Sequence, residues 1–257
     1  QKEYYLTDIV ALAKKDNTKI VTHEAKNEST ISGINSKAEL IAMEKIMKQK
    51  KIEKLVEQGV IIIDPLRTEI RGSLVCGSDV EIDVGCIFEG EVKLGNNVKV
   101  GAYSHVTDSN ILDNSNIKPY SHIDTSEIGM NNNVGPYARL RPGAKTKNNV
   151  NIGNFVEIKN SIIGNNTCIA HLSYVGDSIV GENVNFGAGT KIANLRHDNL
   201  NVKSFVKGEL VDTLRRKLGA ILADGVHTGI NTSINPGRKI WPNKTTLPGE
   251  VVNRDIQ

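Results

Sequence analysis

The feature that most constrains the fold is a six-residue period in the aliphatic residues. The period is carried by Ile82, Phe88, Leu94, Val100, Val106 and Leu112 and, after a slip of one residue, by Ile128, Val134, Leu140, Ile152, Ile158, Ile163, Ile169, Val175, Val180, Phe186 and Ile192. Such a period fits neither a helix of about 3.6 residues per turn nor a simple alternating strand. It is typical of a parallel β-helix, in which each hexapeptide sends one side chain to the axis.

The composition agrees with many tight turns and excludes several classes of function. The 257 residues include 23 Gly, and aromatic residues make up only 4%. The net charge of +3, without a long basic block, gives no indication of nucleic-acid binding. No apolar run reaches the roughly 18 residues of a membrane span. Cys76, Cys86 and Cys168 lack metal-ligand spacing, so we expect free thiols in the cytoplasm.

The first 60 residues lack this period, which divides the chain into two expected domains. Segments 7–17 and 35–59 carry aliphatic residues at three- and four-residue steps and are predicted to form helices. Residues 61–257 are expected to form the β-helix domain. Within that domain the period is lost at about 195–219, which predicts a loop expelled from the coils, with a small hairpin.

Two cations in the repeat are not needed by a β-helix. Arg141 and Lys159 are 18 residues apart, which is three hexapeptides, or one turn of a triangular coil. They would then lie one above the other on the same wall, where a phosphate between them would relieve their repulsion. The alternative is that both are surface cations paired with carboxylates such as Glu157.

His171, with Tyr174 and Asn185 nearby, is a second group that the repeat does not require. A neutral imidazole can accept a proton from an ammonium group, so the combination of His171 with these two residues indicates a site for an anionic amine. The alternative is an ordinary corner histidine. A Cys168–His171 nucleophile pair is disfavoured because Cys168 has no evident orienting partner. The spacing of the six His residues also argues against zinc.

Longer motifs carry a resemblance to a known family, namely "VGPYARLRPGAK", "VNIGNFVEIKNS", "AHLSYVGDSIVGENVNFGAGT" and "KEYYLTDIVALA". Over residues 2–194 the chain resembles the bacterial bifunctional N-acetylglucosamine-1-phosphate uridyltransferase / glucosamine-1-phosphate N-acetyltransferase. The resemblance implies a left-handed β-helix and a homotrimer. It also implies acetyl transfer from acetyl-CoA to the amine of glucosamine 1-phosphate, which supplies N-acetylglucosamine 1-phosphate for UDP-N-acetylglucosamine and cell-envelope synthesis.

The same resemblance implies roles for individual residues, with His171 as the general base. The sugar phosphate is implied to contact Arg141, Lys159, Tyr174 and Asn185. Acetyl-CoA is implied to contact Ala188, Asn194, Lys203, Ile230 and Pro248. Ile230 stands where the bacterial enzymes carry a CoA-contacting Ser, and their C-terminal arm has no counterpart before Gln257. After Asn194 the chain is more similar to archaeal sugar-1-phosphate nucleotidylyltransferase/acetyltransferases, in which a Lys at the position of Lys203 is functional.

Residues 1–60 resemble the end of the uridyltransferase domain, a short helical remnant of an α/β nucleotidyltransferase fold. In "SGINSK", Asn35 matches a Mg²⁺ ligand of that family, so magnesium is expected only together with the uridyltransferase half. The Gly-rich loop that cradles the nucleotide phosphates has no counterpart in this sequence, and we do not expect uridyltransferase activity from this chain.

Two other functions remain open. One is a non-catalytic trimerisation stalk of a split nucleotidylyltransferase, and the other is acyl transfer to another amino-sugar phosphate, such as galactosamine 1-phosphate. The joint presence of His171, Tyr174, Asn185 and the two cations argues against a stalk, because a scaffold does not require them together.

Overall fold

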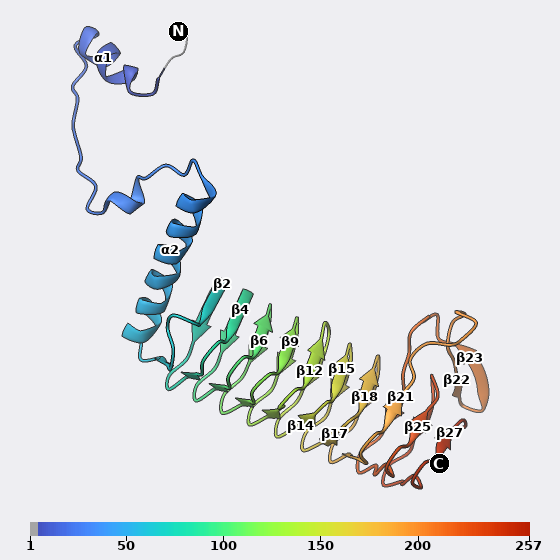
Figure 1. Ribbon diagram of the computed structural model, residues 1–257. Helices are drawn as coiled ribbons and strands as arrows, with labels where there is room; N and C mark the ends of the chain where they lie inside the picture. Colours follow the sequence, from blue (N-terminus) through green and yellow to red (C-terminus); the bar gives the residue numbers. More distant parts are fainter. Residues whose placement is uncertain (1–4) are drawn as a thin grey trace. The chain divides into compact units, whose positions relative to one another are not determined.

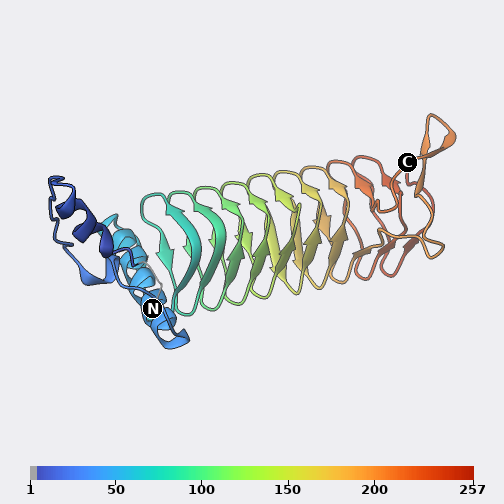
Figure 2. The same ribbon diagram turned by 90° about the horizontal axis from the view of Figure 1, so that it is seen from above.

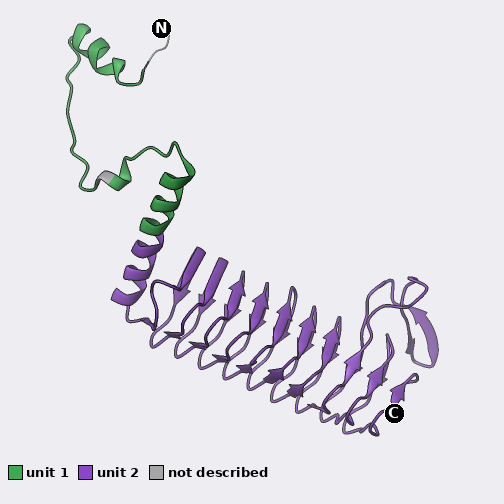
Figure 3. Cartoon of the chain, in the orientation of Figure 1, with its two compact units in different colours: residues 1–47 green, residues 48–257 purple. Residues whose placement is uncertain are grey.

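The computed structural model describes residues 5–257, and its parallel strands confirm the predicted β-helix (Figure 1). The chain divides into two compact units, Gln1–Met47 and Lys48–Gln257 (Figure 3). The helices are α1 (Asp8–Lys15), the 3₁₀ helix η1 (Glu28–Thr30) and α2 (Lys37–Glu57). Helix α1 buries none of its residues, whereas the last turns of α2 belong to the second unit and enter its core.

Helix α2 begins with a capping box and ends by covering the first coil. The Glu39 backbone N–H donates to the Ser36 hydroxyl at 3.2 Å, and the Ser36 N–H donates to the Glu39 carboxylate at 3.1 Å. At the other end Ile52 and Leu55 are buried in the hydrophobic core. A solenoid exposes apolar surface at its ends, and this helix shields one of them.

The strands form three walls, and successive turns of the chain stack along them (Figure 2); beyond Phe186 the first wall continues only as isolated bridges at His227 and Thr245. The first wall contains β1 (Ile61–Ile62), β3 (Glu81–Ile82), β5 (Lys99–Val100), β8 (Asn116–Ile117), β11 (Asn133–Val134), β14 (Asn151–Asn154), β17 (Cys168–His171) and β20 (Asn185–Phe186). The second wall contains β2 (Glu69–Cys76), β4 (Ile87–Leu94), β6 (His105–Thr107), β9 (His122–Asp124), β12 (Arg139–Arg141), β15 (Glu157–Lys159), β18 (Tyr174–Gly176), β21 (Lys191–Ile192), β25 (Ser233–Ile234) and β27 (Val251–Val252).

The third wall continues from the end of β4. It contains β7 (Asn110–Ile111), β10 (Glu127–Ile128), β13 (Lys145–Thr146), β16 (Ile162–Ile163), β19 (Ile179–Val180), β24 (Ile221–Leu222) and β26 (Lys239–Ile240). One side chain of each short strand points to the axis, and nearly all of these are aliphatic and buried. The sequence period therefore marks one continuous core.

One position of the predicted period is wrong, because Ile111 and not Leu112 faces the axis. Ile111 is fully buried, whereas Leu112 is 41% exposed. The corner between the second and third walls is one residue shorter here, since the buried Ser109 hydroxyl donates to the Thr107 carbonyl at 2.6 Å. Ser161 makes the equivalent bond to the Lys159 carbonyl at 2.8 Å. These serines close a tight corner, and coils of 17 residues, such as Ile117 to Val134, occur together with coils of 18, such as Val134 to Ile152.

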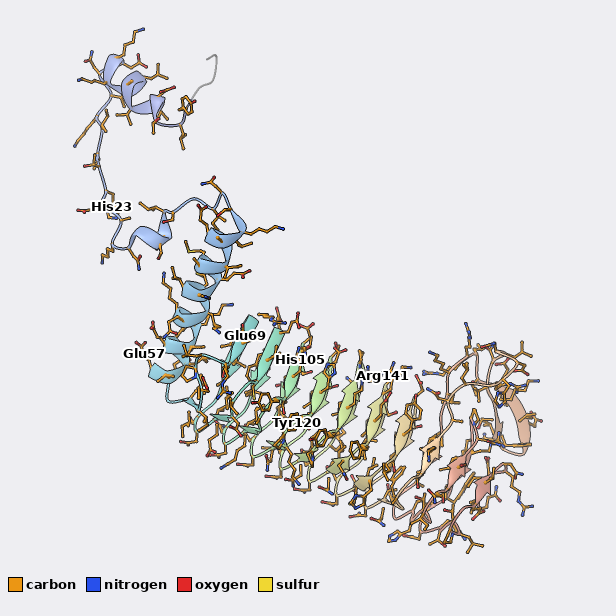
Figure 4. The ribbon with its side chains drawn as sticks, viewed as in Figure 1. His23, Glu57, Glu69, His105, Tyr120 and Arg141 are labelled. Carbon is orange, nitrogen blue, oxygen red and sulfur yellow. The ribbon has the colours of Figure 1, made fainter. Side chains whose placement is uncertain are left out.

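The corner between the first and second walls carries a ladder of exposed side chains. Tyr103, Tyr120, Tyr137 and Phe155 all have positive φ angles, and their rings stack with centroids 5.0–5.6 Å apart. Figure 4 labels Tyr120 at this corner. Leu172, one coil further on, also has a positive φ, of 50°. A bulky residue rarely adopts this conformation, so ring stacking must offset its cost.

The coils are interrupted between β21 and β24. There β22 (Lys203–Val206) and β23 (Glu209–Asp212) form an antiparallel hairpin. Ser204 and Arg238 tie the hairpin to the coils, because the Ser204 hydroxyl donates to the Gly237 carbonyl at 3.0 Å and the Arg238 guanidinium to the Lys203 carbonyl at 3.2 Å. No helix within residues 5–257 is long and apolar enough to cross a membrane.

Candidate functional site

Arg141 and Lys159 lie one above the other on the second wall, as predicted. They are register partners on β12 and β15, and Figure 4 shows Arg141 on this wall, beyond His105. Each cation has a carboxylate partner: Arg141 Nη1 lies 2.7 Å from Glu157 Oε1, and Lys159 Nζ lies 3.2 Å from Asp177 Oδ2. The hydrogen bond that Arg141 donates to Glu157 raises the pKa of Arg141. The group is therefore balanced in charge, and the Glu157 pairing considered as the alternative is present.

Asp177 joins the cations to the next coil. Its side chain is only 7% exposed, and it accepts hydrogen bonds from Asn160 Nδ2 at 2.7 Å and from the Asn194 amide. Burial alone would raise the pKa of Asp177, but the hydrogen bonds from Asn160, Asn194 and Lys159 outweigh it and hold the pKa below its ordinary value. Asp177 therefore remains a carboxylate that fixes three donors at neutral pH.

Tyr174 lies across the same wall, with its hydroxyl next to Asn194. The Asn194 amide donates to the Tyr174 hydroxyl at 3.2 Å. Gly176 makes room for both groups, since a Cβ there would lie 2.5 Å from the Tyr174 hydroxyl and 2.7 Å from Asn194 Nδ2. The absence of a side chain at Gly176 thus lets the phenol reach the Asp177 network.

His171 lies at the end of β17 on the first wall, around the corner from Tyr174. Its ring is exposed, and its Nδ1 lies 3.1 Å from Asn154 Oδ1, one coil earlier. An amide oxygen can only accept, so in this arrangement Nδ1 donates and Nε2 keeps a free lone pair. Cys168 begins the same strand, and its Sγ lies 3.4 Å from Asn151 Nδ2 rather than next to the imidazole.

Three of the residues predicted to contact acetyl-CoA continue the His171 position on later coils. The Gly189 N–H donates to the His171 carbonyl, the Asn231 N–H to the Ala188 carbonyl and the Gly249 N–H to the Ile230 carbonyl. These bonds place the three residues in one column at the corner of the first and second walls. The column consists of Ala188, Ile230 and Pro248. Asn185 begins β20 on the first wall, as the register partner of Cys168.

The structure therefore brings the predicted residues together in two groups and leaves two residues apart. One group, on the second wall and its far corner, contains Arg141, Lys159, Tyr174 and Asn194. The other, on the first wall and its corner, contains His171, Asn185, Ala188, Ile230 and Pro248. Lys203 lies on the hairpin, in β22. Asn35 lies in the other compact unit, where its backbone N–H donates to Glu39.

Sequence reasoning missed several partners of the predicted residues. Asn154 contacts His171, and Asp177, which also accepts from Asn160, holds Lys159 and Asn194 in place. A search at a spacing of 17 residues would have found them, because Asn154 precedes His171 by 17 and Asn160, Asp177 and Asn194 follow one another by 17.

Metal binding finds no support at these positions. Within residues 5–257 no three His, Cys, Asp or Glu side chains are arranged to hold an ion. The amide of Asn35 is a suitable oxygen ligand for Mg²⁺ but has no such group around it.

Comparison with known proteins finds bifunctional GlmU proteins among the curated sequences similar to this chain. The chain is 41% identical over 256 residues to the bifunctional protein GlmU of Methylibium petroleiphilum and 44% identical over 256 residues to that of Marinomonas sp.. The whole chain is covered in both cases. The chain is similar to these bifunctional GlmU proteins. It spans about half their length, 52% and 53% in these two cases, and corresponds to their C-terminal half.

Further matches include a family model and a solved structure. The family model of the GMPPB C-terminal domain matches residues 70–146. Among solved structures, the UDP-N-acetylglucosamine acyltransferase from Campylobacter jejuni aligns with a TM-score of 0.49 at 16% identity, over 68% of either chain.

Proposed function

We propose that the chain transfers an acetyl group from acetyl-CoA to the amine of glucosamine 1-phosphate and releases N-acetylglucosamine 1-phosphate. The observation that carries this proposal is the exposed His171 imidazole, oriented by Asn154 and adjacent to a wall with two stacked cations. The relationship to GlmU supports the assignment, because the same residues are those that the family resemblance implies.

The chemistry requires a base. The acceptor amine is largely protonated near neutral pH, and an ammonium nitrogen has no lone pair with which to attack a thioester. The ammonium first gives one proton to solvent, and the nitrogen loses a second proton as the N–C bond forms and the C–S bond breaks. Nε2 of His171 takes this proton and returns it to the departing thiolate of CoA. The hydrogen bond from Nδ1 to Asn154 keeps the ring in the tautomer that leaves Nε2 free.

The phosphate is held by the cations without breaking their ion pairs. The guanidinium of Arg141 carries five N–H donors and uses one on Glu157, while the ammonium of Lys159 has three and uses one on Asp177. The remaining donors are available to phosphate oxygens. Glu157 and Asp177 thus serve to aim the cations rather than to neutralise them completely.

The site is completed by a second copy of the chain. The corner with His171 and Ala188 and the corner with Asn194 lie at opposite ends of β18, which has three residues and is therefore about 10 Å long. One acetyl-CoA molecule contacts both groups of residues if the corner of one copy faces the second wall of another. We assign these copies to a homotrimer, the closed arrangement that the family resemblance implies.

A thiol-release assay tests the proposal on a sample whose mass is measured by light scattering. Acetyl-CoA with glucosamine 1-phosphate should release CoA, and a trimeric mass is expected. Galactosamine 1-phosphate is the matched acceptor, since it differs only in the direction of one hydroxyl; faster turnover with it would reassign the substrate. If none of the amino-sugar phosphates causes thiol release, the result supports the non-catalytic stalk. An active monomer would contradict a site shared between copies.

A further inference from the structure

Asp177 lies at the corner that follows β18, where the chain passes from the second wall to the third (Figure 1). Its φ angle is +49°, and its backbone N–H donates to the Lys159 carbonyl one coil earlier at 2.9 Å. Asp and Asn adopt this left-handed conformation more readily than most residues. Asn160 occupies the same corner position one coil earlier, with a φ angle of +45°. The corner therefore accepts either residue type, and the fold does not require a negative charge at position 177.

The carboxylate of Asp177 receives its hydrogen bonds from side chains of the proposed site. Oδ1 accepts from Asn160 Nδ2 at 2.7 Å, whereas Oδ2 accepts both from Lys159 Nζ, at 3.2 Å, and from the Asn194 amide. Asp108, at the same corner on an earlier coil, instead accepts from a backbone N–H of β4 at 2.8 Å. Asp108 thus closes its own corner, while one oxygen of Asp177 joins a cation of the phosphate-binding pair to a residue implied to contact the acyl donor.

The charge of Asp177 acts directly on Lys159. The side chains of Asp177 and Lys159 are 7% and 21% exposed, so water and salt screen this ion pair less than one on an open surface. A phosphate bound at Lys159 would lie beside the carboxylate, and the two anions repel each other. The carboxylate therefore holds the ammonium in place and at the same time lowers its affinity for phosphate. Because the proposed product keeps the phosphate of the acceptor, a weaker hold also favours product release.

The same carboxylate determines which way the Asn194 amide points. A carboxylate can only accept, so the amide must turn its nitrogen, and not its oxygen, towards Asp177. That nitrogen also donates to the Tyr174 hydroxyl at 3.2 Å. Within residues 5–257 no group donates to the side-chain oxygen of Asn194, which is free to accept from a ligand. An Asn at position 177 could present either end of its own amide, so the orientation of Asn194 would no longer be fixed.

We propose that Asp177 is a positioning residue that acts on the two substrates in opposite directions. It weakens phosphate binding at Lys159 and strengthens donor binding through Asn194. The identity of the two substrates rests on the proposed function. Asp177 thereby sets the relative affinities of one site for its acceptor and its donor.

Calorimetric titration of the full chain, with CoA and with glucosamine 1-phosphate in separate experiments, tests the proposal without catalysis. Asp177→Asn keeps a residue type that this corner accepts but removes the charge. It should lower the dissociation constant for glucosamine 1-phosphate about threefold to tenfold and raise that for CoA about tenfold, the usual effect of losing one charged hydrogen bond. Asp108→Asn is the matched control, since Asp108 has the same corner position and a φ angle of +42°; it should bind both ligands like the unchanged chain.

A double-mutant cycle tests whether the effect on the donor passes through Asn194. Asn194→Ala alone should weaken CoA binding. Adding Asp177→Asn should weaken it no further, while glucosamine 1-phosphate should still bind more tightly. If Asp177→Asn costs as much CoA affinity without Asn194 as with it, Asp177 acts on the donor by another route and the inference is wrong. Weaker binding of both ligands by Asp177→Asn, together with a lower thermal midpoint, would show that Asp177 only supports the fold.

Thiol release separates this inference from the proposed function. If Asp177→Asn shifts the two affinities in opposite directions but the unchanged chain releases no thiol with glucosamine 1-phosphate, the role of Asp177 in binding stands and the proposed acetyl transfer is wrong. If the unchanged chain acetylates glucosamine 1-phosphate and Asp177→Asn binds both ligands as the unchanged chain does, the inference alone is wrong.

Discussion

The second wall carries two groups of outward side chains that differ in how their members interact, by ring stacking in one group and by ion pairs in the other. On β6 and β9, the rings of His105 and His122 stack with centroids 5.1 Å apart and planes 9° from parallel. His105 Nε2 also lies 3.2 Å from Glu89 on β4. On β12 and β15, by contrast, Arg141 and Lys159 are like charges in one column, and each needs a carboxylate from the neighbouring column or coil.

The difference shows how a structural ladder can be told from a functional site in a solenoid. Where the same residue type recurs at one coil position, as with the paired histidines, the neighbours stabilise one another and nothing further is needed. His171 has no such partner, because Asn154 lies one coil before it and Ala188 one coil after it. A chemically mixed column next to a cation pair is where we expect catalysis.

The largest expected effect is the loss of the isolated histidine. His171→Ala should lower kcat for acetyl transfer about 10²- to 10⁴-fold, the usual contribution of a positioned base, with little change in KM for the acceptor. His105→Ala, in the stacked pair, is the matched control and should change kcat less than about twofold. An equal loss of kcat in the two variants would show that His171 is no more important for catalysis than the stacked His105.

A smaller effect is expected from replacing a cation of the phosphate-binding pair. Arg141→Ala should raise KM for glucosamine 1-phosphate about tenfold to a hundredfold, because one charged hydrogen bond contributes roughly 1.5–3 kcal/mol. The kcat value should change little. Arg139→Ala, on the same strand and 4.0 Å from Glu157, tests whether any nearby cation would do. If KM rises as much in Arg139→Ala, the phosphate is not held at Arg141.

The smallest effect concerns the stacked histidine pair, His105 and His122. Burial, with smaller contributions from His105 and Arg139, holds the pKa of His122 below its ordinary value of 6.5. The unfolded chain therefore binds more protons just below pH 6.5, so this contribution to stability is present above that pH and is lost as the pH falls through it. His122→Gln should flatten the rise in thermal midpoint between pH 5 and pH 7. An unchanged slope would show that the pair does not govern it.

The core of this fold could be predicted from the sequence because every coil repeats the same requirement. An inward aliphatic residue every six positions is visible without any knowledge of partners, and Ile152 and Ile169 show it directly. The predicted slip of one residue was placed after Leu112 instead of before Ile111, because the shortened corner depends on a side-chain hydrogen bond of Ser109 and serine is also common in ordinary turns.

The site was less open to prediction. The stacking of Arg141 on Lys159 followed from an 18-residue spacing, but the role of Asp177 depends on the 17-residue coils that follow. The contact of the hairpin with the last coils was out of reach because segment 195–219 does not repeat, so no spacing relates Ser204 to Gly237.

The ladder of stacked rings has an optical consequence. Tyr103, Tyr120, Tyr137 and Phe155 occupy the early coils, and Trp241, the single tryptophan of the chain, follows β26 near the other end. Each coil of a solenoid contacts only its neighbours, so the two ends need not lose structure together. Near-ultraviolet signals from the stacked phenols and emission from the indole therefore report separately on the two ends of one continuous core.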